Sequence, residues 1–136
     1  MSDDDLDRLF LAGAETAARR LAVRPGLYPF ALAMTVDGRL VAPGIEPGEE
    51  RPAVERVQEL LVEALRAVRD DLRAVVLVSD VRLVSEADGA ETPALLLELE
   101  PRDGDPVVVT VPYAPGPELQ QPTRAAGRRS VWDPAG

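Results

Sequence analysis

Apolar residues recur at two different periods along this chain, and the change of period separates helices from strands. From Ser2 to Leu21 they are spaced three and four positions apart, and the same spacing returns from Ala53 to Leu72. Each segment therefore carries one apolar stripe, as an amphipathic helix does. Ser2 is placed to cap the first helix, and Arg24-Pro25-Gly26 to end it. The pattern predicts two amphipathic helices.

The segment between these helices has the two-residue period of a β-strand. From Leu27 to Val36 the larger side chains share one face and small alanines the other, namely Phe30, Leu32 and Met34 against Ala31 and Ala33. Asp37-Gly38 then favours a two-residue hairpin turn, which would place Met34 opposite Val41. The alanine face indicates either close approach by another element or an open groove.

Three more apolar runs, rich in leucine and β-branched residues, fill the stretch from Ala74 to Ala114. Turn-forming clusters from Ser85 to Thr92 and from Pro101 to Pro106 separate them. The runs are too short for amphipathic helices and the loops are short, so we expect three consecutive antiparallel strands.

Together these elements predict an α+β domain over residues 1–114, followed by an extended tail over residues 115–136. The order is helix, two strands, helix, three strands. We expect a two-layer fold, in which a five-stranded, mainly antiparallel sheet carries both helices on one face. The tail has one large apolar anchor, Trp132, which is expected to pack on its own domain or on a neighbouring copy. Three tail arginines, Arg124, Arg128 and Arg129, favour docking on an acidic body.

The composition removes several kinds of chemistry. The chain has no Cys, His or Lys, and its 15 basic residues are all Arg. Thiolate and imidazole chemistry, Schiff bases and the phosphate-binding Walker lysine are therefore excluded. The GxGxxG, GxxxxGK[ST], HExxH, GxSxG and CxxC patterns are absent as well. We predict a non-enzymatic protein without a cofactor.

The net charge of −9 repels nucleic acid and anionic lipid surfaces. No apolar run approaches the ~20 residues of a membrane span. The first ten residues are acidic, where a signal peptide would be basic. We therefore expect a cytoplasmic protein that binds neither nucleic acid nor membrane.

One group of charged residues offers an alternative hypothesis. Asp80, Glu98 and Glu100 would converge on the open sheet face if their strands pair. Converging carboxylates bind Mg²⁺ or Ca²⁺, or act as acid and base, which would give a small-ligand, metal or hydrolytic site. However, Arg82 is placed to neutralise them, and alternating charges on a strand usually mark its solvated face.

The main hypothesis concerns the apolar residues of the same open face, which need a cover. We expect the tail, a second subunit or another protein to supply it. The chain would then act as a protein-interaction or homodimerising module. The candidate interaction face consists of Val76, Val78, Asp80, Arg82, Leu96, Glu98, Val108, Thr110 and Trp132.

The order of elements, with Tyr28-Pro29-Phe30-Ala31, Asp37-Gly38 and Val111-Pro112-Tyr113, resembles a group of small uncharacterised bacterial α+β proteins. The likeness spans roughly Asp4 to Ala114 and implies a fold but no activity. In size and charge the chain also looks like type III secretion chaperones and toxin-immunity proteins. Those chaperones usually place three strands between their helices and end in a helix, whereas two strands and a tail are expected here.

Overall fold

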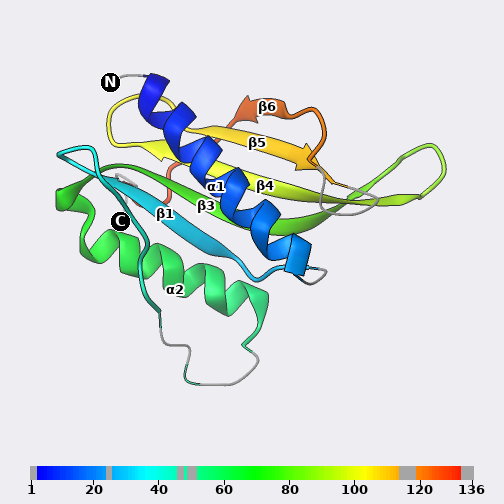
Figure 1. Ribbon diagram of the computed structural model, residues 1–136, viewed down its shortest axis with the longest axis horizontal. Helices are drawn as coiled ribbons and strands as arrows, with labels where there is room; N and C mark the ends of the chain where they lie inside the picture. The colour runs from blue at the N-terminus through cyan, green and yellow to red at the C-terminus, as the bar shows by residue number, and fades with distance from the viewer. Residues whose placement is uncertain (1–2, 24–25, 46–47, 49–51, 114–118, 133–136) are drawn as a thin grey trace.

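The protein is an α+β fold built on one six-stranded antiparallel sheet. The computed structural model describes residues 3–23, 26–45, 48, 52–113 and 119–132. Its elements are α1 (Asp3–Val23), β1 (Phe30–Thr35), β2 (Leu40–Val41), α2 (Val54–Ala67), the 3₁₀ turn η1 (Arg69–Asp71), β3 (Leu72–Val84), β4 (Glu91–Pro101), β5 (Val107–Pro112) and β6 (Thr123–Ala126) (Figure 1). The strand order is β2-β1-β3-β4-β5-β6. The α+β class and antiparallel sheet are confirmed, with β6 as an additional strand.

Helix α1 packs on one face of the sheet through its apolar stripe. Leu6, Leu9, Ala17 and Leu21 join a core with side chains from β1, β3, β4 and β5. A Cβ atom at Gly13 would lie 3.2 Å from Val78 Cγ2 and 3.3 Å from Leu97 Cδ2. Glycine therefore allows the helix axis to lie close to the middle strands.

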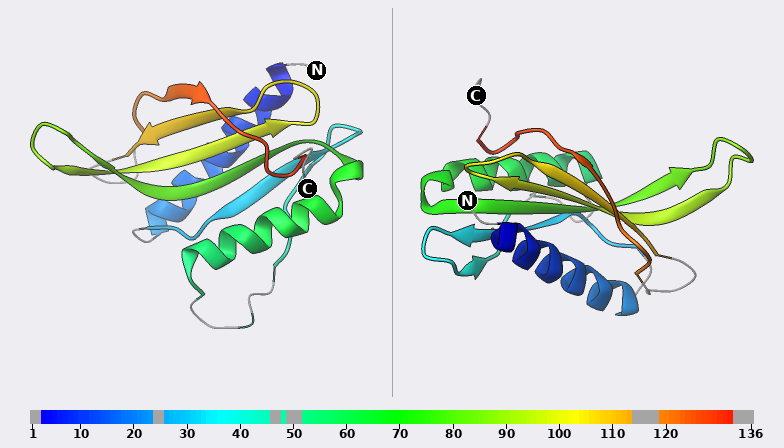
Figure 2. Two further views of the ribbon diagram at one scale, coloured as in Figure 1. Left: turned by 180° about the vertical axis from the view of Figure 1, so that it is seen from behind. Right: turned by 90° about the horizontal axis from the view of Figure 1, so that it is seen from above.

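Helix α2 packs on the opposite face, so the predicted arrangement of both helices on one face is wrong. Figure 2 shows the sheet between the two helices. Val57, Leu61 and Leu65 of α2 form a second core with Ala31 and Ala33 of β1. The small alanines give α2 room to approach, which is the first of the two alternatives expected for that strand face.

The pairing of β3 with β4 corrects the predicted face of β3. Val76 lies opposite Leu99, Val78 opposite Leu97 and Asp80 opposite Leu95. Directly opposed residues of an antiparallel pair project to the same side, so these β3 residues share the face that carries α1. Val75 to Val78 are apolar at every position, and the alternation could therefore not decide which of them faces which side.

The hairpin between β1 and β2 is present, with a register one residue from the predicted one. Met34 pairs with Leu40 rather than with Val41. The backbone N–H of Thr35 donates to the carbonyl of Arg39 at 2.8 Å, which leaves three residues in the loop. Gly38 occupies the positive-φ position at 89° that such loops require.

The tail returns across the molecule. β6 pairs with β5, and residues 127–132, which we call the strap, then cross the sheet face that carries α2. Val131 of the strap is 2% exposed within the α2 core, and Trp132 packs against that core. Of the two places expected for Trp132, its own domain or a neighbouring copy, the structure shows packing on its own domain.

Candidate functional site

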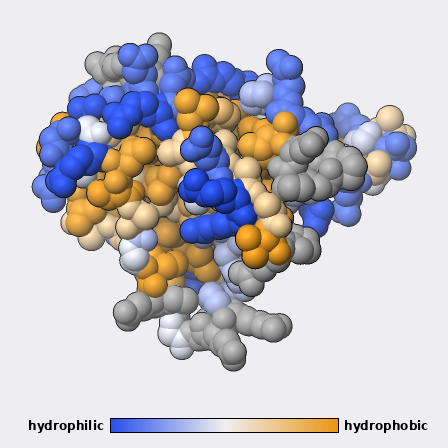
Figure 3. Space-filling view, viewed as in Figure 1, coloured by the Kyte–Doolittle hydropathy of each residue, from blue (hydrophilic) through white to orange (hydrophobic). Residues whose placement is uncertain are grey.

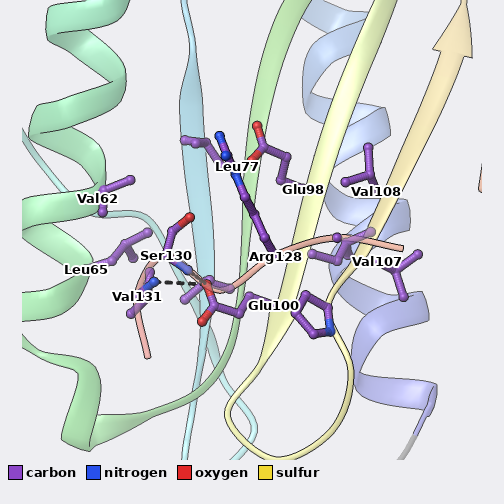
Figure 4. Close-up of a pocket in the computed structure, with 14 residues that line it drawn as sticks. Val62, Leu65, Leu77, Glu98, Glu100, Val107, Val108, Arg128, Ser130 and Val131 are labelled. Carbon is purple, nitrogen blue, oxygen red and sulfur yellow. Dashed lines mark hydrogen bonds between the residues drawn. The ribbon is translucent and has the colours of Figure 1, made fainter. Parts of the chain in front are cut away.

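A cleft remains on the α2-side face, between α2 and the strap. Its floor comes from β3, β4 and β5, one wall from α2 and the other from the strap (Figure 4). We call it the Glu98 cleft, and its central residues are Val62, Leu77, Glu98, Val108, Arg128 and Ser130. The cleft exists because α2 reaches only part of the sheet and the strap crosses beside it.

Glu98 lies half-buried in the floor between two aliphatic side chains. In the sheet it is opposed by Leu77 of β3 on one side and by Val108 of β5 on the other. These neighbours remove water, and this burial raises the pKa of the Glu98 carboxyl, while the positive charge of Arg128 acts in the opposite direction. Among the described residues, Glu98 has no hydrogen bond and no ion pair within 4 Å.

The strap places Arg128 beside this carboxylate. The Arg128 side chain extends from the strap along the cleft toward Glu98 (Figure 4). It also forms no hydrogen bond or ion pair within 4 Å with a described residue. The two charges therefore lie near one another without direct contact.

The α2 wall makes the rim of the cleft acidic. Glu55, Glu59 and Glu63 are exposed along it. Glu59 forms a surface ion pair with Arg56 at 3.5 Å, which is worth little in water. Deeper in the wall, the Gln58 side-chain amide donates to Ser79 Oγ at 3.0 Å and joins α2 to β3. Arg66, Arg128 and Arg129 line the same cleft and partly balance these carboxylates.

Glu100, two residues further along β4, holds the strap in place. Its Oε1 accepts backbone N–H groups of Ser130 and Val131, each at 2.9 Å, and its Oε2 accepts that of Trp132 at 2.9 Å. Arg129 Nη1 lies 3.6 Å from Glu100 Oε2. With 4% of its surface exposed, this carboxylate is fully engaged in structure.

Side chains of α2 and of the following turn η1 also hold the strap. Arg66 Nε donates to the carbonyl of Ser130 at 2.7 Å, and Arg69 Nη1 to that of Val131 at 3.2 Å. Arg129 Nη1 donates to the carbonyl of Pro101 at 2.8 Å. The expected docking of the arginine-containing tail on the acidic body is therefore realised in part by Arg129 with Glu100.

Asp80 lies on the α1-side face and has internal partners. Tyr113 Oη donates to its Oδ1 at 2.6 Å, and the backbone N–H of Leu27 donates to its Oδ2 at 3.2 Å. Burial and the hydrogen bond to Asp80 raise the pKa of Tyr113 to about 12. Asp80 thus joins the segment after α1 to the end of β5.

The three carboxylates of the alternative hypothesis therefore do not converge. Asp80 lies on the opposite sheet face, Glu100 is occupied by the strap, and Glu98 stands alone in the cleft floor. Within residues 3–23, 26–45, 48, 52–113 and 119–132, no group of three or more acidic side chains is arranged to hold a metal ion.

The residues of the candidate interaction face are divided between the two sides of the sheet. Val76 and Val78 are fully buried under α1, and Arg82 lies with Asp80 on that side. Leu96, Val108 and Thr110 share the α2-side face with Glu98 and are partly exposed. Trp132 lies on the strap, and its buried Nε1 has no hydrogen-bond partner in the described part of the chain. Of the nine predicted residues, Leu96, Glu98, Val108 and Thr110 therefore lie together on one exposed surface of the sheet.

Two sets of cleft residues were not predicted from the sequence. Val62 and Gln58 were missed because α2 was placed on the wrong face. Arg128 and Ser130 were missed as cleft residues because the tail gave no periodic pattern. The cluster of tail arginines did indicate that the tail docks on the acidic body, but it did not show where on the sheet the tail would lie.

A second apolar area lies on the α1 side, next to the helix over β1 and β2 (Figure 3). Leu40, which pairs with Met34 of the α1 core, is exposed there. β2 has only two residues and Pro43 follows it closely, and both features limit pairing at a sheet edge. The buried carboxylate beside this area, Asp5, is already paired with Arg73 at 2.9 Å, so the Glu98 cleft remains the candidate site.

No helix in the described part of the chain is long and apolar enough to cross a membrane. A scan against protein-family models finds no match, and searches of curated proteins and of solved structures find none either.

Proposed function

We propose that this protein is a non-enzymatic binding module that holds a protein partner against the Glu98 cleft and the adjoining surface of β4 and β5. The observation that carries the proposal is the state of Glu98. It is a half-buried carboxylate between Leu77 and Val108, with no hydrogen bond from a described residue. Its oxygens still reach water, and a cationic donor from another molecule would replace that water with charge-assisted hydrogen bonds.

Binding accounts for the site better than catalysis does. Acid–base work needs two titrating groups with different environments, and the other carboxyl of the cleft floor, Glu100, already accepts three backbone N–H groups of the strap. The partly exposed Leu96, Val108 and Thr110 extend the floor as a mainly apolar surface. Apolar surface around one charged group is what a protein interface commonly provides.

A different protein fits this surface better than a second copy of the chain. Two copies meeting face to face would bring two Glu55–Glu59–Glu63 rims together, in addition to a net charge of −9 on each chain. Like charges across an interface oppose association. We therefore infer a hetero-complex, and a homodimer is the competing outcome of the test.

The test is site-specific photo-crosslinking followed by a binding measurement. p-Benzoylphenylalanine replaces Val108 in the cleft or, as a matched control, Glu15 on the exposed side of α1. We expect a crosslinked partner from position 108 and not from position 15. The purified partner should then bind the native chain, and Leu96→Asp should weaken its affinity at least tenfold.

Two results would contradict this function. One is equal crosslinking from positions 108 and 15, because it would mean that the cleft has no preferred occupant. The other is an adduct of twice the chain mass, together with a dimer in light scattering, which would replace the hetero-complex by a homodimer.

A further inference from the structure

We propose that Glu98 selects the partner by receiving one of its basic side chains, a lysine or an arginine, in the Glu98 cleft. This inference rests on the proposed function and deepens it. It assigns the specificity of the interface to one carboxylate, and it names the chemistry of the group that this carboxylate binds.

The first argument is the unused bonding capacity of Glu98. An ionised carboxylate has about four acceptor sites on its two oxygens. The described residues donate to none of them, whereas Glu100 on the same strand face accepts three backbone N–H groups. A guanidinium or ammonium group would supply charge-assisted hydrogen bonds, which are stronger than those of neutral donors.

The second argument is the shape and polarity of the surroundings. Leu77 and Val108 flank the carboxylate, and Val62 of α2 adds a third aliphatic side chain to the cleft. The aliphatic stem of a lysine or arginine can lie along such walls while its charged end reaches the acid. A neutral polar side chain would gain the hydrogen bonds without the charge attraction.

The third argument is electrostatic. The exposed Glu55, Glu59 and Glu63 carboxylates line the α2 wall above Glu98. Arg66, Arg128 and Arg129 line the same cleft against four carboxylates, so the local field favours cations only slightly, and the net charge of −9 supplies the longer-range attraction for a basic surface. An acidic partner would be repelled by the net negative charge of the whole chain.

Arg128 shows that a guanidinium fits into this space. Its side chain already lies along the cleft toward Glu98, without an ion pair within 4 Å (Figure 4). The residue is exposed, so a partner cation can displace its end toward solvent. We therefore assign Arg128 as an internal competitor, which a partner's basic side chain replaces.

A small-molecule titration tests the assignment directly. The probe is N-acetyl-arginine N-methylamide, and its neutral control is the citrulline analogue, which has nearly the same shape. Backbone amide NMR shifts of the full chain are followed at low salt. We expect the arginine probe to shift residues around positions 77, 98 and 108 with millimolar affinity, equivalent to about −4 kcal/mol, and the citrulline analogue to shift none.

Four variants separate a binding role from a structural one. Glu98→Gln keeps the shape and should abolish the response, whereas Glu98→Asp keeps the charge and should retain part of it. Glu15→Gln should leave the response unchanged. Arg128→Gln should tighten the probe about twofold to threefold, because a competing like charge at a solvated site is removed. Equal shifts with citrulline, or an unchanged response in Glu98→Gln, would overturn the assignment.

The failure of this inference can be told apart from failure of the proposed function. If the crosslinked partner binds Glu98→Gln as tightly as the native chain, the cleft is an interface but Glu98 does not select the partner. If the arginine probe binds through Glu98 and no partner is captured at position 108, the cleft binds small cations instead of a protein.

Discussion

Glu98 and Glu100 are the same residue type, two positions apart on the same face of β4, and their environments differ sharply. The Glu100 carboxylate accepts three backbone N–H groups from the strap. Glu98 is opposed only by Leu77 and Val108, and its pKa is raised by burial. One carboxylate therefore stabilises the fold, and the other lowers its stability while it remains ionised.

Replacing Glu98 by glutamine should stabilise the protein at neutral pH. Burial raises the pKa of Glu98 in the folded state. The stability contributed by protonated Glu98 is therefore complete below its pKa in the unfolded chain and is lost as pH rises through its pKa in the folded protein. Glu98→Gln removes the charge, so the free energy of unfolding should rise by about 0.5 kcal/mol at pH 7, an amount reduced by solvent screening. The difference should vanish near pH 4. Urea unfolding at both pH values measures it.

The charged groups facing position 98 are the same in the native chain and in the Glu98→Gln variant. They are Arg128 and Arg129 of the strap and Glu55, Glu59, Glu63 and Arg66 of α2. Their own titration therefore cancels in the comparison, and Glu15→Gln gives the baseline for loss of an exposed charge. A Glu98→Gln variant less stable than the native chain at pH 7 would show that the carboxylate has a structural partner.

At the scale of elements, the sequence predicts those helices and strands whose apolar residues recur on one side. The stripes of α1 and α2 and the alternation of β1 and β4 are each one-sided, and these elements are present, although α2 ends at Ala67 and Leu72 belongs to β3 instead of the helix. β3 is apolar at every position from Val75 to Val78, so its facing had to come from its pairing with β4. Helix α2 packs on the face of β1 that carries the small alanines. Their size predicted that another element lies close to this face, but it did not show that the element is α2.

Gly13 tests the packing of α1 on the sheet. Gly13→Val should lower the free energy of unfolding by about 2 kcal/mol, because the added atoms would overlap Val78 and Leu97. Glu15→Val introduces the same side chain on the exposed part of the helix and should change stability by less than about 0.5 kcal/mol. Urea unfolding of both variants measures the difference. Equal effects would mean that the helix moves away from the sheet without cost.

At the scale of the molecule, the sheet is covered by three separate pieces of chain. α1 covers one face, and α2 and the strap divide the other. The candidate site is what these covers leave open. Its walls come from segments distant in sequence, with Val62 on α2 and Arg128 on the strap, so no local motif could reveal it.

Removing the strap should uncover the α2 core. A chain ending at Ala126 loses the burial of Val131, worth about 1.5–3 kcal/mol, and leaves Glu100 without its three donors, at a cost of about 1–3 kcal/mol. We expect a lower urea midpoint and increased binding of the dye ANS. A chain ending at Trp132 keeps the described strap contacts and is the control.

The full-length variant Val131→Ala covers the case in which the shortened chain does not fold. It should lose about 2 kcal/mol and keep the strap hydrogen bonds to Glu100. Unchanged stability in both the shortened chain and this variant would mean that the strap contributes nothing to the core.

The position of Trp132 has a practical consequence. It is the one tryptophan in the sequence, and it lies on the strap against the α2 core. Its fluorescence is therefore an intrinsic, label-free signal of strap position: emission shifts to longer wavelength when the indole enters water. Stopped-flow mixing can then time the release of this segment in the native chain, with no dye attached.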